Sequence, residues 1–244
     1  MTGMIGLHFA PANAKLIALE EKTGRKLYSF STLSGWACPY AMECESRIVY
    51  DGNGFSIQDG PDTQFRCFSA SQEVIFPAVR EARLRNYELL ALAAQDVQAA
   101  VDTVLAQIPQ DAEIIRLHVA GDFKTQNYFD VWLAVAQQTP HINYYAYTKS
   151  LPFWVARLGQ IPSNLVLTAS YGGRRDAMIA QYGLRYAKVL KYESEAKDLG
   201  LEIDHDDSHA YLNGPSFGLL VHGIQPAGSE WGTAARTNGG SYSR

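Results

Sequence analysis

The sequence predicts an α/β protein built on a partial or complete (β/α) barrel-like parallel sheet. Short apolar runs alternate with amphipathic stretches of helical period between residues 114 and 221, an order typical of parallel strands joined by right-handed crossovers. Polar residues follow the expected strands, as they do at the rim of a barrel, where active sites gather. A doubly wound open sheet, with its cleft at the same edge, is the alternative. No repeat or linker interrupts the chain, so residues 1–244 are expected to form a single domain.

The first part of the chain is expected to begin this sheet. Residues 1–26 carry Gly and Pro around short apolar pieces and predict a lead-in segment with one edge hairpin. Residues 27–31 alternate apolar and small polar side chains, a pattern typical of a strand. Residues 35–70 are expected to form a metal-binding loop with a cysteine-bearing hairpin insertion, because Asp51-Gly52-Asn53 joins two strand-like runs.

The remaining elements follow from hydrophobic periodicity. Residues 71–107 are rich in Ala, Leu, Glu and Arg and predict one long helix or two. Strands are expected at residues 114–120, 142–147, 164–169, 187–190 and 217–221. Helices are expected at residues 128–138, 151–158, 176–182 and 193–199. The Gly-, Ser- and Thr-rich composition of residues 228–244 predicts a loose tail.

Composition narrows the class of protein. With 47% hydrophobic and 19% charged residues the chain is an ordinary globular one, and its net charge of -4 leaves only a local patch for any nucleic acid. No apolar run reaches the roughly 18 residues of a membrane span, and we expect no membrane partner. The first residues do not resemble a secretory signal. An odd number of cysteines without an export signal then predicts a cytoplasmic protein that uses its thiols for metal binding or catalysis.

The three cysteines, Cys38, Cys44 and Cys67, are the only ones in the chain. All three flank turn residues, and loops can fold several thiolates onto one point. Three thiolates suit zinc or an iron–sulfur cluster. The alternative is that they are small buried hydrophobic residues, a common use of free cysteine. We favour the metal-binding interpretation because none of the three lies in an apolar run.

Several polar residues are expected beside the cysteines, at the carboxyl ends of the strands. Asp122, Lys149 and Ser170 each end an expected strand and predict a pocket for a small molecule or nucleotide. The segment from Asp204 to His209 packs five potential metal ligands into six positions. It resembles either a hydrolase metal site or a solvated loop, and we include His205, Asp207 and His209 among the substrate-binding candidates.

Other polar groups are open to two interpretations. His118 lies in an apolar strand, on the face expected to be opposite Leu117 and Val119, and is interpreted as a core histidine. Five arginines form the basis of an alternative function, in which the protein contacts nucleic-acid phosphates and a zinc ion or cluster is structural. They are Arg80, Arg83, Arg85, Arg174 and Arg175, the last two following Gly172-Gly173.

Seven short motifs between residues 30 and 230 are shared with one family of proteins. They cover residues 34–39, 59–68, 118–123, 145–149, 167–170, 204–209 and 225–229. On these motifs the chain is identified as a member of the gene-product-eighty-eight family of phage and prophage proteins. The resemblance implies a phage protein of the host cytoplasm, and it implies no particular activity.

In architecture the chain is also similar to radical S-adenosylmethionine enzymes, in which a partial barrel carries three cluster-binding cysteines after its first strand. Cys38 and Cys44 follow the first expected barrel strand, and Gly121-Asp122 ends the next long one. The spacing departs from the Cys-x3-Cys-x2-Cys pattern of that family, since five residues separate the first two cysteines and twenty-two precede Cys67. The resemblance implies a [4Fe–4S] cluster, with S-adenosylmethionine as a candidate second cofactor.

We therefore expect an iron–sulfur protein, and an iron–sulfur enzyme is the candidate activity, although no catalytic residue is identified. Three cysteines leave one iron of a four-iron cluster without a thiolate. A histidine is a candidate for closing it, and zinc held by three Cys and one His fits the same residues. The candidate histidines are His118, His205, His209 and His222.

Overall fold

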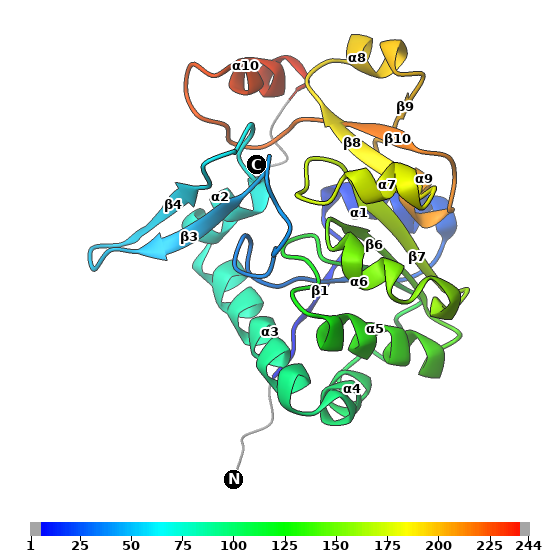
Figure 1. Cartoon of the computed structure of the whole chain (residues 1–244). Coiled ribbons are helices and arrows are strands. Elements are labelled where there is room, and N and C mark those ends of the chain that lie inside the picture. The colour runs from blue at the N-terminus through cyan, green and yellow to red at the C-terminus, as the bar shows by residue number, and fades with distance from the viewer. Residues whose placement is uncertain (1–5, 240–244) are drawn as a thin grey trace.

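The computed structural model describes residues 6–239 and contains one large and one small sheet (Figure 1). The large sheet has the strand order β1-β2-β5-β6-β7-β8-β10-β9. Its strands are β1 (Phe9–Pro11), β2 (Leu27–Phe30), β5 (Ile114–Leu117), β6 (Asn143–Thr148), β7 (Leu165–Ser170), β8 (Tyr186–Leu190), β9 (Glu202–Ile203) and β10 (Phe217–Leu220). All pairings are parallel except β1 with β2. The predicted α/β class with a mostly parallel sheet is confirmed.

The strand order also decides between the two expected topologies. From β2 to β8 the order across the sheet follows the order along the chain, whereas a doubly wound sheet reverses near its centre. The doubly wound alternative is therefore wrong. The sheet ends at β1 and β9, so the described residues do not form a closed barrel.

Ten α-helices and one 3₁₀ turn lie within residues 6–239. They are α1 (Ala14–Thr23), α2 (Phe68–Ile75), α3 (Pro77–Gln95), α4 (Val97–Leu105), α5 (Gln126–Gln138), α6 (Leu151–Val155), a 3₁₀ turn (Leu158–Gln160), α7 (Ala177–Gln181), α8 (Glu193–Asp198), α9 (Ser208–Tyr211) and α10 (Glu230–Thr237). The single or double helix expected over residues 71–107 is three helices. Pro77 begins α3, and Asp96 accepts from the amide of Ala99 to begin α4, positions that both residue types favour. None of these helices is long and apolar enough to cross a membrane.

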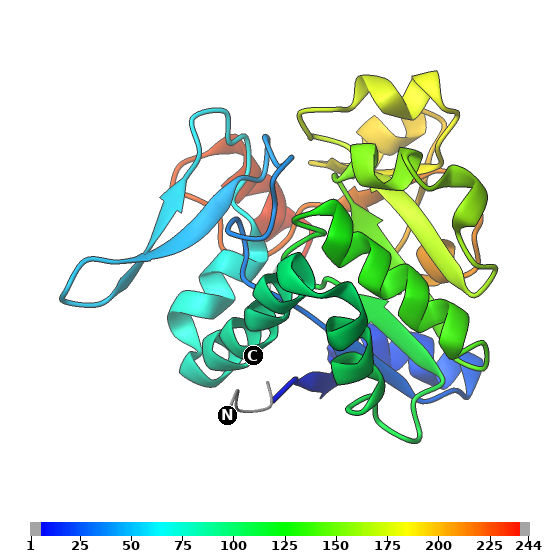
Figure 2. The same ribbon diagram turned by 60° about the horizontal axis from the view of Figure 1, so that its bottom comes forward.

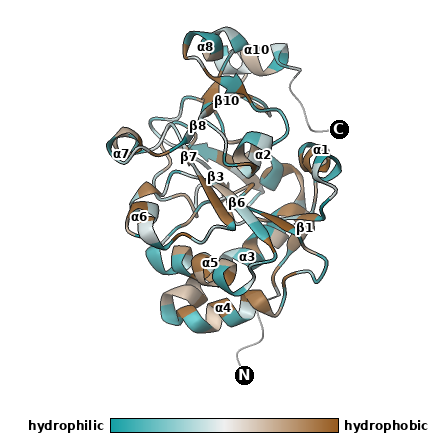
Figure 3. Cartoon of the chain, turned by 90° about the vertical axis from the view of Figure 1, so that its right-hand side faces the viewer, coloured by the Kyte–Doolittle hydropathy of each residue, from teal (hydrophilic) through white to brown (hydrophobic). Residues whose placement is uncertain are grey.

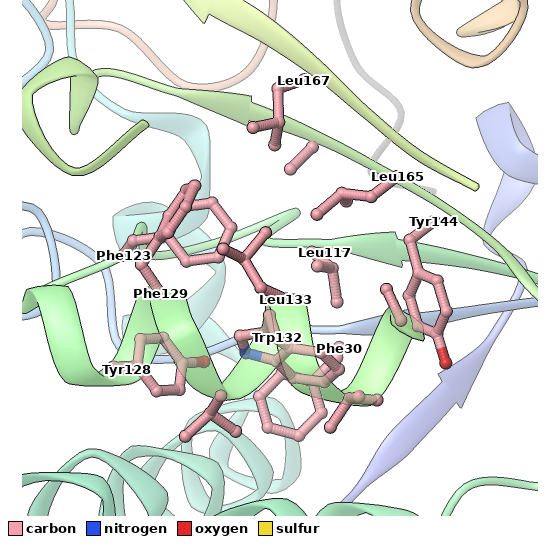
Figure 4. Packing of buried hydrophobic residues seen from close by; sticks show 14 of the residues in the cluster. Phe30, Leu117, Phe123, Tyr128, Phe129, Trp132, Leu133, Tyr144, Leu165 and Leu167 are labelled. Carbon is pink, nitrogen blue, oxygen red and sulfur yellow. The ribbon is translucent and has the colours of Figure 1, made fainter. Parts of the chain in front are cut away.

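The main core lies between one face of the sheet and helices α3, α4 and α5. Trp132 and Phe129 of α5 pack toward Leu117 and Leu165 of the strands (Figure 4), and the Trp132 ring lies 4.9 Å from that of Phe30. The α5 ribbon carries both apolar and polar stretches (Figure 3), as expected of a helix with one buried face. We call this the helix-covered face of the sheet.

The opposite face of the sheet is covered only in part. Helix α1 contacts β2, and α9 contacts β6 and β7. These two helices bury a smaller apolar cluster that includes Leu16, Ile114, Tyr145 and Phe217. The rest of this face borders a cavity, so we call it the cavity face.

The small sheet is the hairpin of β3 (Ser46–Tyr50) and β4 (Phe55–Asp59), which projects from the body of the molecule (Figure 2). Its turn is held by Asp51, whose Oδ1 accepts from the amides of Asn53 and Gly54 at 2.9 and 3.1 Å. The hairpin bears no cysteine, because Cys44 precedes β3 and Cys67 follows β4. The expectation of a cysteine-bearing hairpin is corrected to a hairpin flanked by cysteines.

Both ends of the described chain differ from the expected structure. Instead of an edge hairpin, residues 6–26 supply edge strand β1 and helix α1. The tail expected to be loose contains α10, which begins where Ser229 Oγ accepts from the amide of Gly232. The Trp231 ring lies 4.9 Å from that of Phe65, so an aromatic contact fixes this helix despite its Gly- and Ser-rich surroundings. Residues 240–244 of the expected tail lie outside the described residues.

Candidate functional site

A cavity of about 910 Å³ lies at the carboxyl ends of the strands and extends along the cavity face. It is lined by all three cysteines. Of the six predicted substrate-binding residues, five also line it: Asp122, Lys149, Ser170, His205 and Asp207. His209 does not line the cavity, and its Nε2 lies 2.8 Å from Glu202 Oε2. The structure thus brings together most of the residues predicted from strand ends and from the cysteine loops.

Backbone contacts hold the cysteine loops in place. Gly35 begins the turn before Cys38 with φ +69°, and a side chain there would meet Ser46 O at 2.6 Å. The loop that carries Cys44 is joined to the Gly172-Gly173 loop by the bond from Glu43 N to Gly172 O, 3.0 Å. Cys67 precedes α2, and its amide donates to Ser46 Oγ at 3.2 Å.

The three thiols share one desolvated environment. Burial raises the pKa of Cys38 well above its ordinary value, and the charges of Asp122, Cys67 and Cys44 raise it further. Burial raises the pKa of Cys44 to about 11, while the charge of Lys149 opposes this rise. Burial also raises the pKa of Cys67. Without a metal all three are neutral thiols at pH 7, so binding of a metal centre must displace their protons.

The thiols line one cavity without closing on a single point. Within residues 6–239, no three or more His, Cys, Asp or Glu side chains are grouped so that they could hold a metal ion in this arrangement. The same holds for the segment from Asp204 to His209. The segment is only partly solvated, since Asp204 and Asp207 are buried while His205 is exposed.

The ends of β5, β6 and β7 meet through Asp122 and Lys149. Asp122 accepts from Thr148 Oγ1 at 2.6 Å and from the amide of Lys149 at 2.8 Å. Lys149 Nζ donates to Ser170 Oγ at 2.9 Å and also to the carbonyls of Ser170 and Tyr171. In the described part of the chain no carboxylate forms an ion pair with Lys149. Its ammonium group is therefore held at the cavity by neutral oxygens.

Gly121 explains how Asp122 reaches this position. Its φ of +81° suits glycine, and a side chain would lie 2.0 Å from Thr32 Oγ1, in the loop after β2. This close approach packs the β5 end against the loop that leads to the cysteines.

A second group of charged residues lines the cavity face. Asp207 is fully buried and accepts from Lys15 Nζ at 2.7 Å, from Arg116 Nη1, and from the Tyr145 and Tyr147 hydroxyls at 3.1 and 3.2 Å. We call these five residues together with Asp204 the Asp207 cluster. Burial opposes ionisation of Asp207, yet Arg116 and Lys15 hold its pKa below the ordinary value.

Sequence reasoning found Asp207 and the segment that begins at Asp204, but missed Lys15 and Arg116 as site residues. One signal was available, because Arg116 is a charged residue inside the apolar run of β5. A buried arginine needs a partner, and a strand side chain alternates between faces. No sequence pattern pointed to Lys15, which lies on a helix nearly two hundred residues before its partner.

The histidines fall into different environments. His118 is buried, its Nε2 lies 3.1 Å from Tyr128 OH, and burial lowers its pKa to about 3. His118 is buried as expected of a core histidine, but it also lines the cavity, its Nδ1 has no partner among the described residues, and the expected face is wrong. A left-handed backbone, φ +59°, breaks the strand alternation and turns the ring toward Tyr128, which packs with Leu117 on the helix-covered face. His222 lines the cavity, and burial lowers its pKa to about 4.

Three of the five arginines expected to contact phosphates are engaged by the protein itself. Arg83 pairs with the buried Glu73 at 2.9 Å, Arg80 donates to Glu73 O at 2.8 Å, and Arg174 pairs with Glu45 at 2.7 Å. The Gly172 and Gly173 amides both donate to Asp176. Arg85 and Arg175 are exposed.

Together the sheet and the cavity define a parallel α/β protein with a cysteine-lined site at the carboxyl ends of its strands. A family model described as Gene product 88 matches residues 7–241, and the chain belongs to this family. The Gene 88 protein of Mycobacterium phage L5 is 28% identical over 106 residues, 40% of this chain and 44% of that protein. The match thus spans less than half the length of this curated relative. No solved structure matches the chain.

Proposed function

We propose that this phage protein is an iron–sulfur protein in which Cys38, Cys44 and Cys67 hold a [4Fe–4S] cluster beside a small-molecule or nucleotide pocket. The observation that carries the proposal is that all the cysteines of the chain, brought from separate loops, line one cavity. Chance burial of three small apolar residues would not require a shared cavity that also contains Lys149 and Asp122.

The arrangement of the thiols favours a cluster over zinc. A zinc ion needs four ligands within about 2.0–2.3 Å of one point, whereas the cysteines of a cubane cluster bind different irons and lie farther apart. Three thiols that line one cavity, without a fourth cysteine in the chain, suit a cluster that leaves one iron for another ligand. A cluster held there would supply electron transfer, and its iron without a cysteine would be open to a ligand.

Neighbouring residues provide the environment that a cluster needs. Lys149 favours the thiolate form of Cys44 through its charge. Phe65 and Phe68 line the cavity next to Cys67, and apolar shells of this kind limit solvent access to a metal centre.

The topology supports the finer interpretation of the fold as a partial (β/α) barrel. Its parallel strands follow one another across the sheet, and the cavity lies on the face opposite the main helix layer. Radical S-adenosylmethionine enzymes combine these features with three cysteines after the first barrel strand. We therefore propose an iron–sulfur enzyme of related architecture, with S-adenosylmethionine as a cofactor to be tested.

The test is anaerobic purification followed by absorption spectra and iron, sulfide and zinc analysis of the wild type, Cys67→Ala and Ser71→Ala. We expect about four irons and four sulfides per chain in the wild type and loss of the cluster in Cys67→Ala. Ser71→Ala is the matched control, because Ser71 lines the same cavity and its hydroxyl has no partner in the described part of the chain. It should keep the cluster.

Other outcomes would contradict the proposal. One zinc per chain would make the centre structural and favour the nucleic-acid alternative, which salt-dependent RNA or DNA binding would then test. A metal-free protein under anaerobic conditions, even after reconstitution with iron and sulfide, would overturn it. S-adenosylmethionine that binds equally to wild type and Cys67→Ala would argue against a cofactor held by the cluster.

A further inference from the structure

Two buried polar atoms of the Asp207 cluster have no hydrogen-bond partner among residues 6–239. They are Nε of Arg116 and Oδ2 of Asp204, each shielded from solvent and without a hydrogen bond among the described residues. Both residues line the cavity. Asp204 is 3% exposed. Buried polar groups in native proteins are almost always hydrogen-bonded, and an unsatisfied one calls for an explanation such as a ligand. Here one atom is a donor and the other an acceptor.

The groups around these atoms favour a molecule that presents a carboxylate to Arg116 and a hydrogen-bond donor to Asp204. Asp207 is shared by two cations, Lys15 and Arg116, so the pair carries one positive charge more than Asp207 neutralises. Asp204 is the other acid of the cluster, and burial raises its pKa, while the charge of Lys15 opposes this rise and that of Asp207 adds to it. A phosphate dianion would lie against the carboxyl groups of Asp204 and Asp207. A single carboxylate with an adjacent N–H or O–H instead matches the donor, Arg116 Nε, and the acceptor, Asp204 Oδ2.

We propose that the Asp207 cluster binds an α-amino acid or α-hydroxy acid unit of a small molecule, with its carboxylate on Arg116 and its amino or hydroxyl group donating to Asp204. Arginine presents a fork of donors suited to carboxylates, and Asp207 occupies only Nη1 of this fork. The cavity, about 910 Å³, lies in the range of known small-molecule sites. The inference rests on the proposed function, which places a small-molecule pocket beside the cysteines. It goes further by naming the chemical class of the bound molecule.

The test is a thermal-shift screen of the full-length protein with the standard L-amino acids and their α-hydroxy analogues, followed by calorimetric titration of the best binder. We expect at least one compound to bind. Its amide, which lacks the carboxylate, and its desamino or deoxy analogue should each bind about tenfold or more weakly, the usual effect of losing a hydrogen bond to a charged group.

Variants locate the site. Asp204→Asn is nearly isosteric and should weaken the amino or hydroxy acid about tenfold or more, while the desamino or deoxy acid should be affected little. Arg116→Gln should weaken both. Arg175→Gln, on the exposed surface, is the matched control and should bind as the wild type does. Arg116→Gln also removes a partner of Asp207 and could prevent folding. If it does, the milder Asp204→Asn decides the assignment.

Contrary results are equally clear. If no amino or hydroxy acid binds, if amides bind as well as acids, or if Asp204→Asn leaves affinity unchanged, the inference is overturned. Iron content and ligand affinity are measured separately on the wild type and on Cys67→Ala. If the wild type binds the ligand but contains no iron, this inference holds and the cluster proposal fails. If the wild type contains a cluster but binds no ligand, the cluster proposal holds and this inference fails.

Discussion

The two faces of one sheet use the same strands for different purposes. In β5, Ile115 and Leu117 belong to the main core on the helix-covered face, while Arg116 between them belongs to the Asp207 cluster. In β6, Tyr144 packs into that core, and Tyr145 and Tyr147 donate to Asp207 on the cavity face. Strand alternation alone produces this division.

The contrast teaches that the two faces stabilise the fold through different forces. The helix-covered face is filled by apolar and aromatic side chains, and its contribution depends on volume and packing. The cavity face holds charged groups that satisfy one another only in part, so its contribution depends on charge. Substitutions on the two faces should therefore respond to different conditions.

The largest effect is expected on the helix-covered face. Trp132→Ala removes the bulkiest fully buried side chain and should lower the free energy of unfolding by roughly 3–5 kcal/mol, because the core cannot refill the space. Chemical denaturation measures the change. Leu212→Ala, 66% exposed in the wild type, is the control and should shift it by less than about 0.5 kcal/mol. A similar small loss in Trp132→Ala would contradict the assignment of this face as the stability core.

A slightly smaller effect with a different signature is expected on the cavity face. Asp207→Asn leaves Lys15 and Arg116 without their carboxylate and should cost about 3 kcal/mol at neutral pH. The folded pKa of Asp207 is lowered, so its stabilisation is present above the unfolded value of about 3.9 and is lost as the pH falls toward the folded value. The difference between wild type and variant should therefore shrink in acid. A pH-independent difference would show that packing, not charge, holds this residue.

The smallest effect concerns His118, which the left-handed backbone turns toward the helix-covered face. His118→Asn, a residue that tolerates this backbone, removes the contact with Tyr128 and should cost about 1 kcal/mol at neutral pH. The wild-type histidine stays neutral to about pH 3 when folded but takes up a proton near pH 6.5 when unfolded.

Wild-type stability from this group should thus fall as the pH drops below about 6.5, and the gap to His118→Asn should close. Chemical denaturation of both proteins at several pH values between neutral and mildly acidic measures this difference in the free energy of unfolding. His141→Asn on the exposed surface serves as control. A gap that stays constant with pH would mean that His118 is not buried as a neutral ring.

Sequence periodicity by itself determined the α/β class and the succession of strands and helices along the chain, because the alternation of strands and helices is a local property. It also placed Asp122, Lys149 and Ser170 at one rim, since parallel strands end at one edge. The tertiary structure alone decided the open sheet, the left-handed turn of His118 and the ordering of α10 by the Trp231 contact. It alone joined Lys15 and Arg116 to Asp207. These contacts join residues far apart in the chain, and they depend on how the elements pack, which no local pattern encodes.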